Sequence, residues 1–225
     1  MVYKIAVIVF ACVLWKLYLA YKDRFEPEPI PDLLLTFASG AAAAVVCSYL
    51  FDVVDSLVLT RDAMFLIDHD RVGFLGYSLG VIGPLEECCK ILPFLLFCTR
   101  LRAFGNVTDG IIYASFIGLG FACVENFIFM EYLEGPALYL RSLTSPLVHM
   151  LFASIWGYAY AKARYAGRST VLPTLLGLLI ASLAHGFYDF LATDPALMVG
   201  SSIIIAIIWC TMIWKLGKLA PKQAS

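Results

Sequence analysis

The sequence has few charged residues and lacks the short motifs of several common protein classes. Asp, Glu, Lys and Arg make up 15% of its 225 residues, and the formal net charge is −1. Electrostatics therefore give no reason to expect a nucleic-acid partner. The chain has seven cysteines but no CxxC pair, which argues against a zinc knuckle, a redox motif or a disulfide framework. HExxH, the helical zinc motif of many metalloproteases, is also absent.

Apolar residues are abundant instead. They form 61% of the chain and give a mean hydropathy of +0.85, whereas a soluble domain is nearer half apolar. They cluster in runs of about 20 residues, the length of a membrane-spanning helix. We predict an all-α, multi-pass bundle in the cell membrane, with one integral domain over residues 1–225. Seven spans are predicted, near 3–21, 33–51, 72–99, 108–130, 142–162, 171–192 and 197–216.

The positions of Lys and Arg predict how the bundle is oriented, because cytoplasmic loops carry an excess of both. The richer side holds Lys22, Arg24, Arg100, Arg102, Lys162, Arg164, Arg168, Lys215, Lys218 and Lys222. The poorer side holds Lys4, Arg61, Arg71 and Arg141. We expect an external N-terminus and a cytoplasmic C-terminus. The loops between spans are too short for a soluble catalytic domain, so any chemistry lies in the membrane or at its edge.

Ionisable residues inside the spans carry most of the functional information. They are Glu86, Glu87 and Lys90 in span three, Glu125 in span four, His149 in span five, and His185 and Asp189 in span six. Each would cost several kcal/mol if it faced lipid. Taken singly, each has a structural explanation, since i,i+4 pairs neutralise one another and a membrane histidine commonly bonds a neighbouring helix.

The predicted depths of these residues favour one shared site. Counting about 1.5 Å per residue, Glu125, His149 and His185 lie roughly 8–11 Å below the outer boundary, with Glu86 and Glu87 somewhat deeper. We predict a polar cavity between spans three to six. Carboxylates and imidazoles around one cavity suit hydrolysis, the first activating water and the second assisting as proton donors. Alternatively, Glu125, His149 and His185 bind a metal such as zinc, with Glu86 or Glu87 as the base.

The order of the motifs resembles a known family. Glu86-Glu87-x-x-Lys90, then DGIIYASFIGLGFACVEN at 109–126, then His149, then His185-x-x-x-Asp189 looks like the PrsW family of intramembrane proteases over residues 72–192. That family is related to the CAAX prenyl proteases, from which this sequence departs at Lys90 and Glu125. The resemblance implies a peptidase that cuts a membrane-anchored regulator, such as an anti-sigma factor, near its outer face, as the first step of a signalling cascade.

The resemblance also implies roles for individual residues. Glu86 would be the general base, acting with Glu125, while Glu87 would be a second base or orient the first. His185 would stabilise the oxyanion or bind metal, and His149 would be a second donor or ligand. The supporting residues would be Lys90, Asn126 and Asp189. Both a metal-dependent and a metal-free mechanism fit these residue types.

Two other classes remain open at this point. A non-proteolytic membrane scaffold of the same superfamily could retain the membrane histidines, and a transporter could also place Glu and His in its helices. Adjacent carboxylates such as Glu86 and Glu87 favour the protease, because a scaffold does not need them. A transporter would more often show inverted repeats, and the sequence shows none.

Overall fold

Helices occupy every apolar run of the sequence, which confirms the predicted all-α fold. The computed structural model describes residues 1–58, 63–194 and 196–219, and within these ranges it contains no strand. The longer elements are α1 (Val2–Lys22), α2 (Ile30–Val58), α5 (Gly83–Leu96), α6 (Val107–Phe129), α7 (Gly135–Tyr165), α8 (Val171–Ala192) and α9 (Met198–Leu219). The shorter ones are α3 (Ala63–His69), α4 (Arg71–Tyr77), the π-helical turn η1 (Ser78–Ile82) and the 3₁₀ turn η2 (Cys98–Arg100).

Five of the described helices are long and apolar enough to cross a membrane: α1, α2, α6, α8 and α9. The other two predicted spans coincide with α7 and with the continuous segment α4–η1–α5. These two segments carry several of the charged and histidine side chains of the bundle, which makes them less apolar. The count of seven spans stays a prediction, while the multi-pass membrane character is established.

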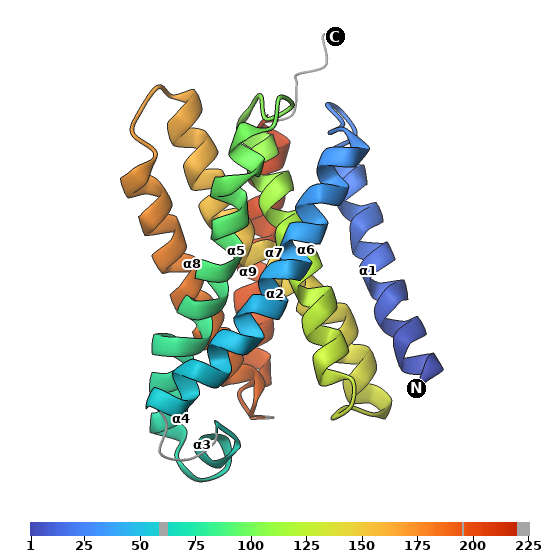
Figure 1. The fold of residues 1–225 in the computed structure, drawn as a ribbon, viewed down its shortest axis with the longest axis vertical. Helices are drawn as coiled ribbons and strands as arrows, with labels where there is room; N and C mark the ends of the chain where they lie inside the picture. Colours follow the sequence, from blue (N-terminus) through green and yellow to red (C-terminus); the bar gives the residue numbers. More distant parts are fainter. Residues whose placement is uncertain (59–62, 195, 220–225) are drawn as a thin grey trace.

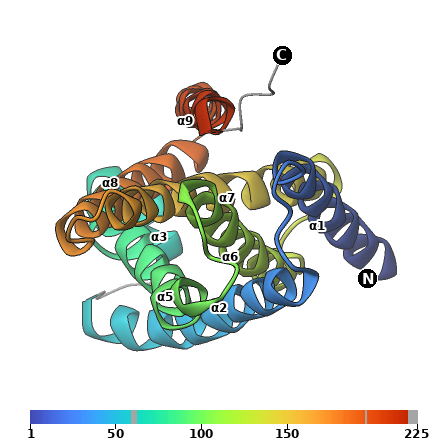
Figure 2. The ribbon, with the colours of Figure 1, turned by 90° about the horizontal axis from the view of Figure 1, so that it is seen from above.

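Helix α6 forms the centre of the bundle. Figure 2 shows it surrounded by α1, α2, α5 and α7, with α9 at the periphery. Its side chains are buried on all sides from Asp109 to Cys123, as expected for a helix that is apolar all round. Helix α7 packs along one side of α6, and α8 packs against α5 and α7 (Figure 1). Polar side chains directed inward from α5, α6, α7 and α8 can therefore meet.

The connection between α1 and α2 is fixed to the start of α6 by hydrogen bonds. The hydroxyl of Tyr113 donates to Glu28, and the backbone N–H of Glu28 donates to Asp23 at 2.7 Å. Asn106 and Asp109 form a capping box at the N-terminus of α6. Burial, reinforced by the neighbouring carboxylates of Asp109 and Asp23, raises the pKa of Glu28 to about 8.

Contacts at one end of the bundle agree with the predicted arrangement of the loops. The Nζ atom of Lys4 lies 3.0 Å from the carbonyl oxygen of Met130 and 3.5 Å from Glu134. The N-terminus and the loop before α7 therefore lie at the same end, and α9 finishes at the opposite end (Figure 1). Which end is cytoplasmic stays a prediction, and two residues on which it rests, Arg61 and Lys222, lie outside the described residues.

One feature of the cysteines differs from expectation. The sequence argued against a disulfide framework, but Cys12 and Cys123 form a disulfide between α1 and α6. Their separation of 111 residues follows no motif, so the pairing depends on which helices pack together. Of the remaining cysteines, Cys88 and Cys210 are exposed, and Cys47, Cys89 and Cys98 are buried.

Candidate active site

Glu86 and Glu87 reach the bundle interior from the beginning of α5. The π-helical turn Ser78–Ile82 comes directly before this helix, and Pro84 lies in its first turn. Single π turns are rare and are frequently found at functional sites. The segment before Glu86 thus contains one wider helical turn. Both carboxylates are buried, and so is Lys90 one turn further on.

Lys90 compensates part of the buried negative charge. Its Nζ atom lies 2.8 Å from Oε1 of Glu87 and 3.3 Å from Oε2 of Glu86. A buried carboxylate without such a partner would be strongly destabilising. Lys90 therefore offsets the charge of both carboxylates.

Both oxygens of Glu87 are occupied by hydrogen-bond donors. Besides Lys90, Oε1 contacts Nδ1 of His185 at 2.9 Å, and Oε2 accepts from the indole N–H of Trp156 at 2.9 Å. A carboxylate can only accept from the imidazole, so Nδ1 of His185 carries the hydrogen. Glu87 consequently orients His185, and its occupied oxygens leave it poorly suited to act as a base.

Glu125 orients the second histidine in the same way. Its Oε2 atom lies 2.8 Å from Nε2 of His149, so this ring nitrogen carries the hydrogen. Glu125 also contacts Nη2 of Arg141 at 3.0 Å and the hydroxyl of Ser145 at 3.3 Å. The opposite ring nitrogen of His149, Nδ1, is buried and has no hydrogen-bond partner among the described residues.

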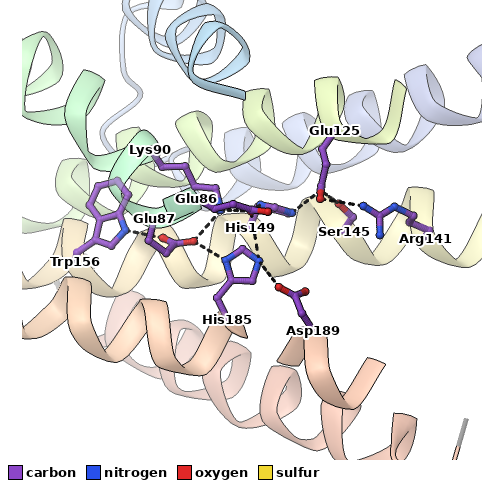
Figure 3. Close-up of polar contacts among 10 residues, drawn as sticks. All are labelled: Glu86, Glu87, Lys90, Glu125, Arg141, Ser145, His149, Trp156, His185 and Asp189. Carbon is purple, nitrogen blue, oxygen red and sulfur yellow. Dashed lines mark hydrogen bonds and ion pairs between the residues drawn. The ribbon is translucent and has the colours of Figure 1, made fainter. Parts of the chain in front are cut away.

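Glu86, His149 and His185 converge at the centre of the cluster (Figure 3). One possible ligand atom from each lies within 4.8 Å of the others, and all three residues are buried. Oε2 of Glu86 is 3.7 Å from Nδ1 of His149 and 3.7 Å from Nε2 of His185. Ligand atoms of a tetrahedral zinc site lie about 3.4 Å from one another. The spacing and the unpaired Nδ1 therefore fit a metal ion.

Two glycines allow the helices that carry these residues to approach closely. A Cβ atom added at Gly83 of α5 would lie 2.1 Å from the carbonyl oxygen of Ser182 on α8. A Cβ atom added at Gly118 of α6 would lie 2.5 Å from the carbonyl oxygen of His149 on α7. Real Cβ contacts are essentially never that short. The absence of a side chain at both positions thus helps to bring the four helices together at the site.

Comparison with known proteins now decides between the functional classes. A family profile described as PrsW family intramembrane metalloprotease matches residues 28–214. The chain belongs to the PrsW family. It is similar to Protease PrsW of Clostridioides difficile (strain 630), with 29% identity over 87% of this chain and 80% of that protein. It is also similar to Protease PrsW of Bacillus subtilis (strain 168), with 25% identity over 92% of this chain and 88% of that protein. No solved structure matches the chain.

Membership of the PrsW family confirms the resemblance found in the sequence. The protein is a multi-pass intramembrane protease, which sets aside the scaffold and the transporter as alternatives. The family is described as a metalloprotease, and the Glu86, His149 and His185 group is a possible metal site. The matched range extends on both sides of residues 72–192, where the motifs were recognised.

The residues singled out by the PrsW resemblance differ in how closely they are tied to the cluster. The structure brings the predicted residues Glu86, Glu87, Lys90, Glu125, His149 and His185 together, but the possible ligand set contains Glu86 in place of Glu125. Asp189 lies 3.7 Å from Nε2 of His185, so the carboxylate that bonds this ring is Glu87. Asn126 is buried, and its side-chain amide has no hydrogen-bond partner within the described part of the chain.

Three contacting residues were not identified as site residues from the sequence: Arg141, Ser145 and Trp156. All three lie on α7, together with His149. Their positions, 141, 145, 149 and 156, are four, four and seven residues apart, which places them on one face of a helix. That spacing was visible in the sequence and could have identified them.

Proposed function

We propose that this protein hydrolyses a peptide bond of a membrane-anchored regulatory protein, such as an anti-sigma factor, near the outer surface of the membrane. The observation that carries the proposal is the convergence of Glu86, His149 and His185. Glu125 and Asp189 lie about one turn from the ends of α6 and α8, at the end of the bundle that is predicted to be external. A substrate reaching the cluster from that end would be cut close to the membrane surface.

Two imidazoles and a carboxylate form a ligand set that suits zinc, so the proposal includes a zinc ion. Oε2 of Glu86, Nδ1 of His149 and Nε2 of His185 would hold it. When bound, such an ion polarises the scissile carbonyl and lowers the pKa of water. Glu125 and Glu87 keep the two rings in the tautomers that leave these nitrogens free.

Asp189 accepts the proton of the attacking water in this proposal. It is the one carboxylate of the cluster whose only contact within the described chain is the 3.7 Å approach to His185, and its side chain is 27% exposed. A partly exposed carboxylate can receive a proton from water and pass it to the leaving amine. Lys90 offsets the negative charge of Glu86 and Glu87 during these steps.

Metal analysis of the purified protein in detergent tests the zinc site. We expect about one zinc per wild-type chain and almost none in the His149→Ala/His185→Ala double variant. His69→Ala is the matched control, because this third histidine is exposed on α3 and its loss should leave the metal content unchanged. A wild-type protein that cleaves without metal would overturn the zinc site and make Glu86 the base.

The substrate class is tested separately, by comparing the terminal peptides of membrane proteins in cells that express the wild type or Glu86→Gln. We expect a single-span membrane protein to be shortened near its outer membrane boundary only with the wild type. If no membrane-anchored protein is shortened, the proposed substrate class is wrong. Equal shortening with Glu86→Gln would remove that residue from the reaction.

A further inference from the structure

Three donor side chains on α7 point at the carboxylate of Glu125. They are Arg141, Ser145 and His149, spaced four residues apart, so each lies about 6 Å further along the helix than the previous one. Figure 3 shows the resulting row, with Arg141 at the end opposite Trp156. Arg141 is partly exposed, with 32% of its side-chain surface accessible, whereas the side chain of His149 is 4% exposed. The row therefore runs from the rim of the site to its buried centre.

The two oxygens of Glu125 are used differently. Oε2 contacts both His149, at 2.8 Å, and Ser145, at 3.3 Å. Oε1 contacts Nη2 of Arg141 at 3.0 Å, and this is its sole polar contact in the described part of the chain. The guanidinium of Arg141 is itself held 4.1 Å over the ring of Phe129. Arg141 thus fixes the oxygen of Glu125 that the histidine leaves free.

The same order of groups occurs on the other side of the cluster. His185 is oriented by Glu87, and Glu87 is held by the cation Lys90. His149 is oriented by Glu125, and Glu125 is held by the cation Arg141. Each imidazole then presents its remaining nitrogen to Oε2 of Glu86 at 3.7 Å. Partners of this outer kind orient metal-bound histidines in many proteins.

We propose that Arg141 is a positioning residue of the metal site. It holds Glu125 in the orientation that directs Nδ1 of His149 toward Glu86 and His185. The inference rests on the proposed function, because it needs the metal that these three residues would bind. In this role Arg141 differs from an ordinary interfacial arginine. Such an arginine would only orient the bundle in the membrane, and its loss would not change the metal affinity.

The test measures zinc affinity of the intact protein in detergent by competition with a chromophoric chelator. We expect Arg141→Gln to weaken zinc binding about 10-fold, the lower end of the effect of losing an outer-shell partner. Arg141→Lys should recover most of the affinity, because it restores a cation near Oε1. Arg164→Gln is the matched control: Arg164 lies on the same helix and donates to the carbonyl oxygen of Thr99, so its loss should leave zinc binding unchanged.

A double variant separates positioning from a loss of folding. If Arg141 acts through Glu125, then Arg141→Gln adds no further loss of zinc affinity in a Glu125→Gln background. The d–d absorption spectrum of the cobalt-substituted protein should also change in Arg141→Gln, because the geometry at His149 changes. Thermal unfolding identifies a variant that is simply unstable.

The outcomes distinguish this inference from the proposed function. Wild-type zinc affinity in Arg141→Gln, or an equal loss in Arg164→Gln, would overturn the role of Arg141 alone. Independent losses in the double variant would also overturn it. If the wild type itself binds no zinc or cobalt, the metal-dependent part of the proposed function fails, and the role of Arg141 fails with it.

Discussion

The substitution Gly83→Ala should separate α5 from α8 and thereby disable the site without touching a polar side chain. The added Cβ would lie 2.1 Å from the carbonyl oxygen of Ser182 and 2.7 Å from the backbone nitrogen of Gly186. Ordinary contacts begin at 3.4 Å, so the two backbones must move apart by more than 1 Å. His185 lies between these two contact points on α8, and its 2.9 Å hydrogen bond to Glu87 would be broken.

Two effects of this movement can be measured. Overpacking a close contact costs about 1–3 kcal/mol of stability, which thermal unfolding in detergent would report as a lower Tm. A displacement of 1 Å at a catalytic group can reduce the rate about 10²-fold. The rate assay would use the substrate found by the terminal-peptide comparison, in reconstituted membranes.

Gly76→Ala provides the matched control for this experiment. Gly76 lies on α4, in the same continuous helical segment, and an added Cβ there meets no atom within 4 Å. We expect it to unfold and cleave like the wild type. If Gly83→Ala also cleaves at the wild-type rate with an unchanged Tm, the close contact between α5 and α8 does not hold the site together.

Three further predictions concern the cluster, the orientation and the pH dependence. Glu86→Gln and His185→Ala should each lower cleavage by about 10²- to 10⁴-fold in protein that still folds, and near-wild-type cleavage by both would reject the site. Cysteines introduced at Lys218 and Glu134 should label from the cytoplasmic and the external side, respectively, and labelling from one side would mean a wrong span count. Burial raises the pKa of Glu28 from its ordinary 4.5 to about 8, so the folded chain keeps a proton that the unfolded chain releases. The proton on Glu28 stabilises the folded state fully below about pH 4.5, and this stabilisation is lost as the pH rises to about 8. The Tm of the wild type should therefore fall between these pH values, and the Tm of Glu28→Gln should fall less.

The positions of the helices followed from the apolar runs, and the errors have a physical cause. The predicted span 171–192 coincides with α8, whereas the predicted span 142–162 lies inside α7, which runs from Gly135 to Tyr165. The additional turns of α7 contain Tyr and Arg residues, which lower hydropathy but are compatible with a helix. Hydropathy therefore located the part of each helix that suits lipid, and it missed the polar turns beyond.

The membership of the site was largely predictable, but its internal geometry was not. Charged groups inside apolar spans need partners, so Glu86, Glu87, His149 and His185 could be expected to meet. The choice of which carboxylate faces which ring nitrogen depends on side-chain rotamers and on helix packing, which a single sequence does not contain. For this reason Glu86 belongs to the possible ligand set, whereas Glu125, which was predicted as a ligand, contacts the far nitrogen of His149. Arg141 was interpreted only as a residue that orients the bundle, although its spacing from His149 placed it on the same helical face.

If the substrate is a membrane-anchored protein, as proposed, the burial of Glu86, His149 and His185 sets a condition on it. A membrane-spanning segment of a substrate satisfies its backbone hydrogen bonds within its own helix, and in that form its peptide bonds are shielded by side chains. To reach the cluster, the segment must first unwind locally and give up several of those bonds. The ease of unwinding then selects among substrates, so that glycine, proline and other weak helix formers near the cleaved bond would matter more than a particular recognition sequence.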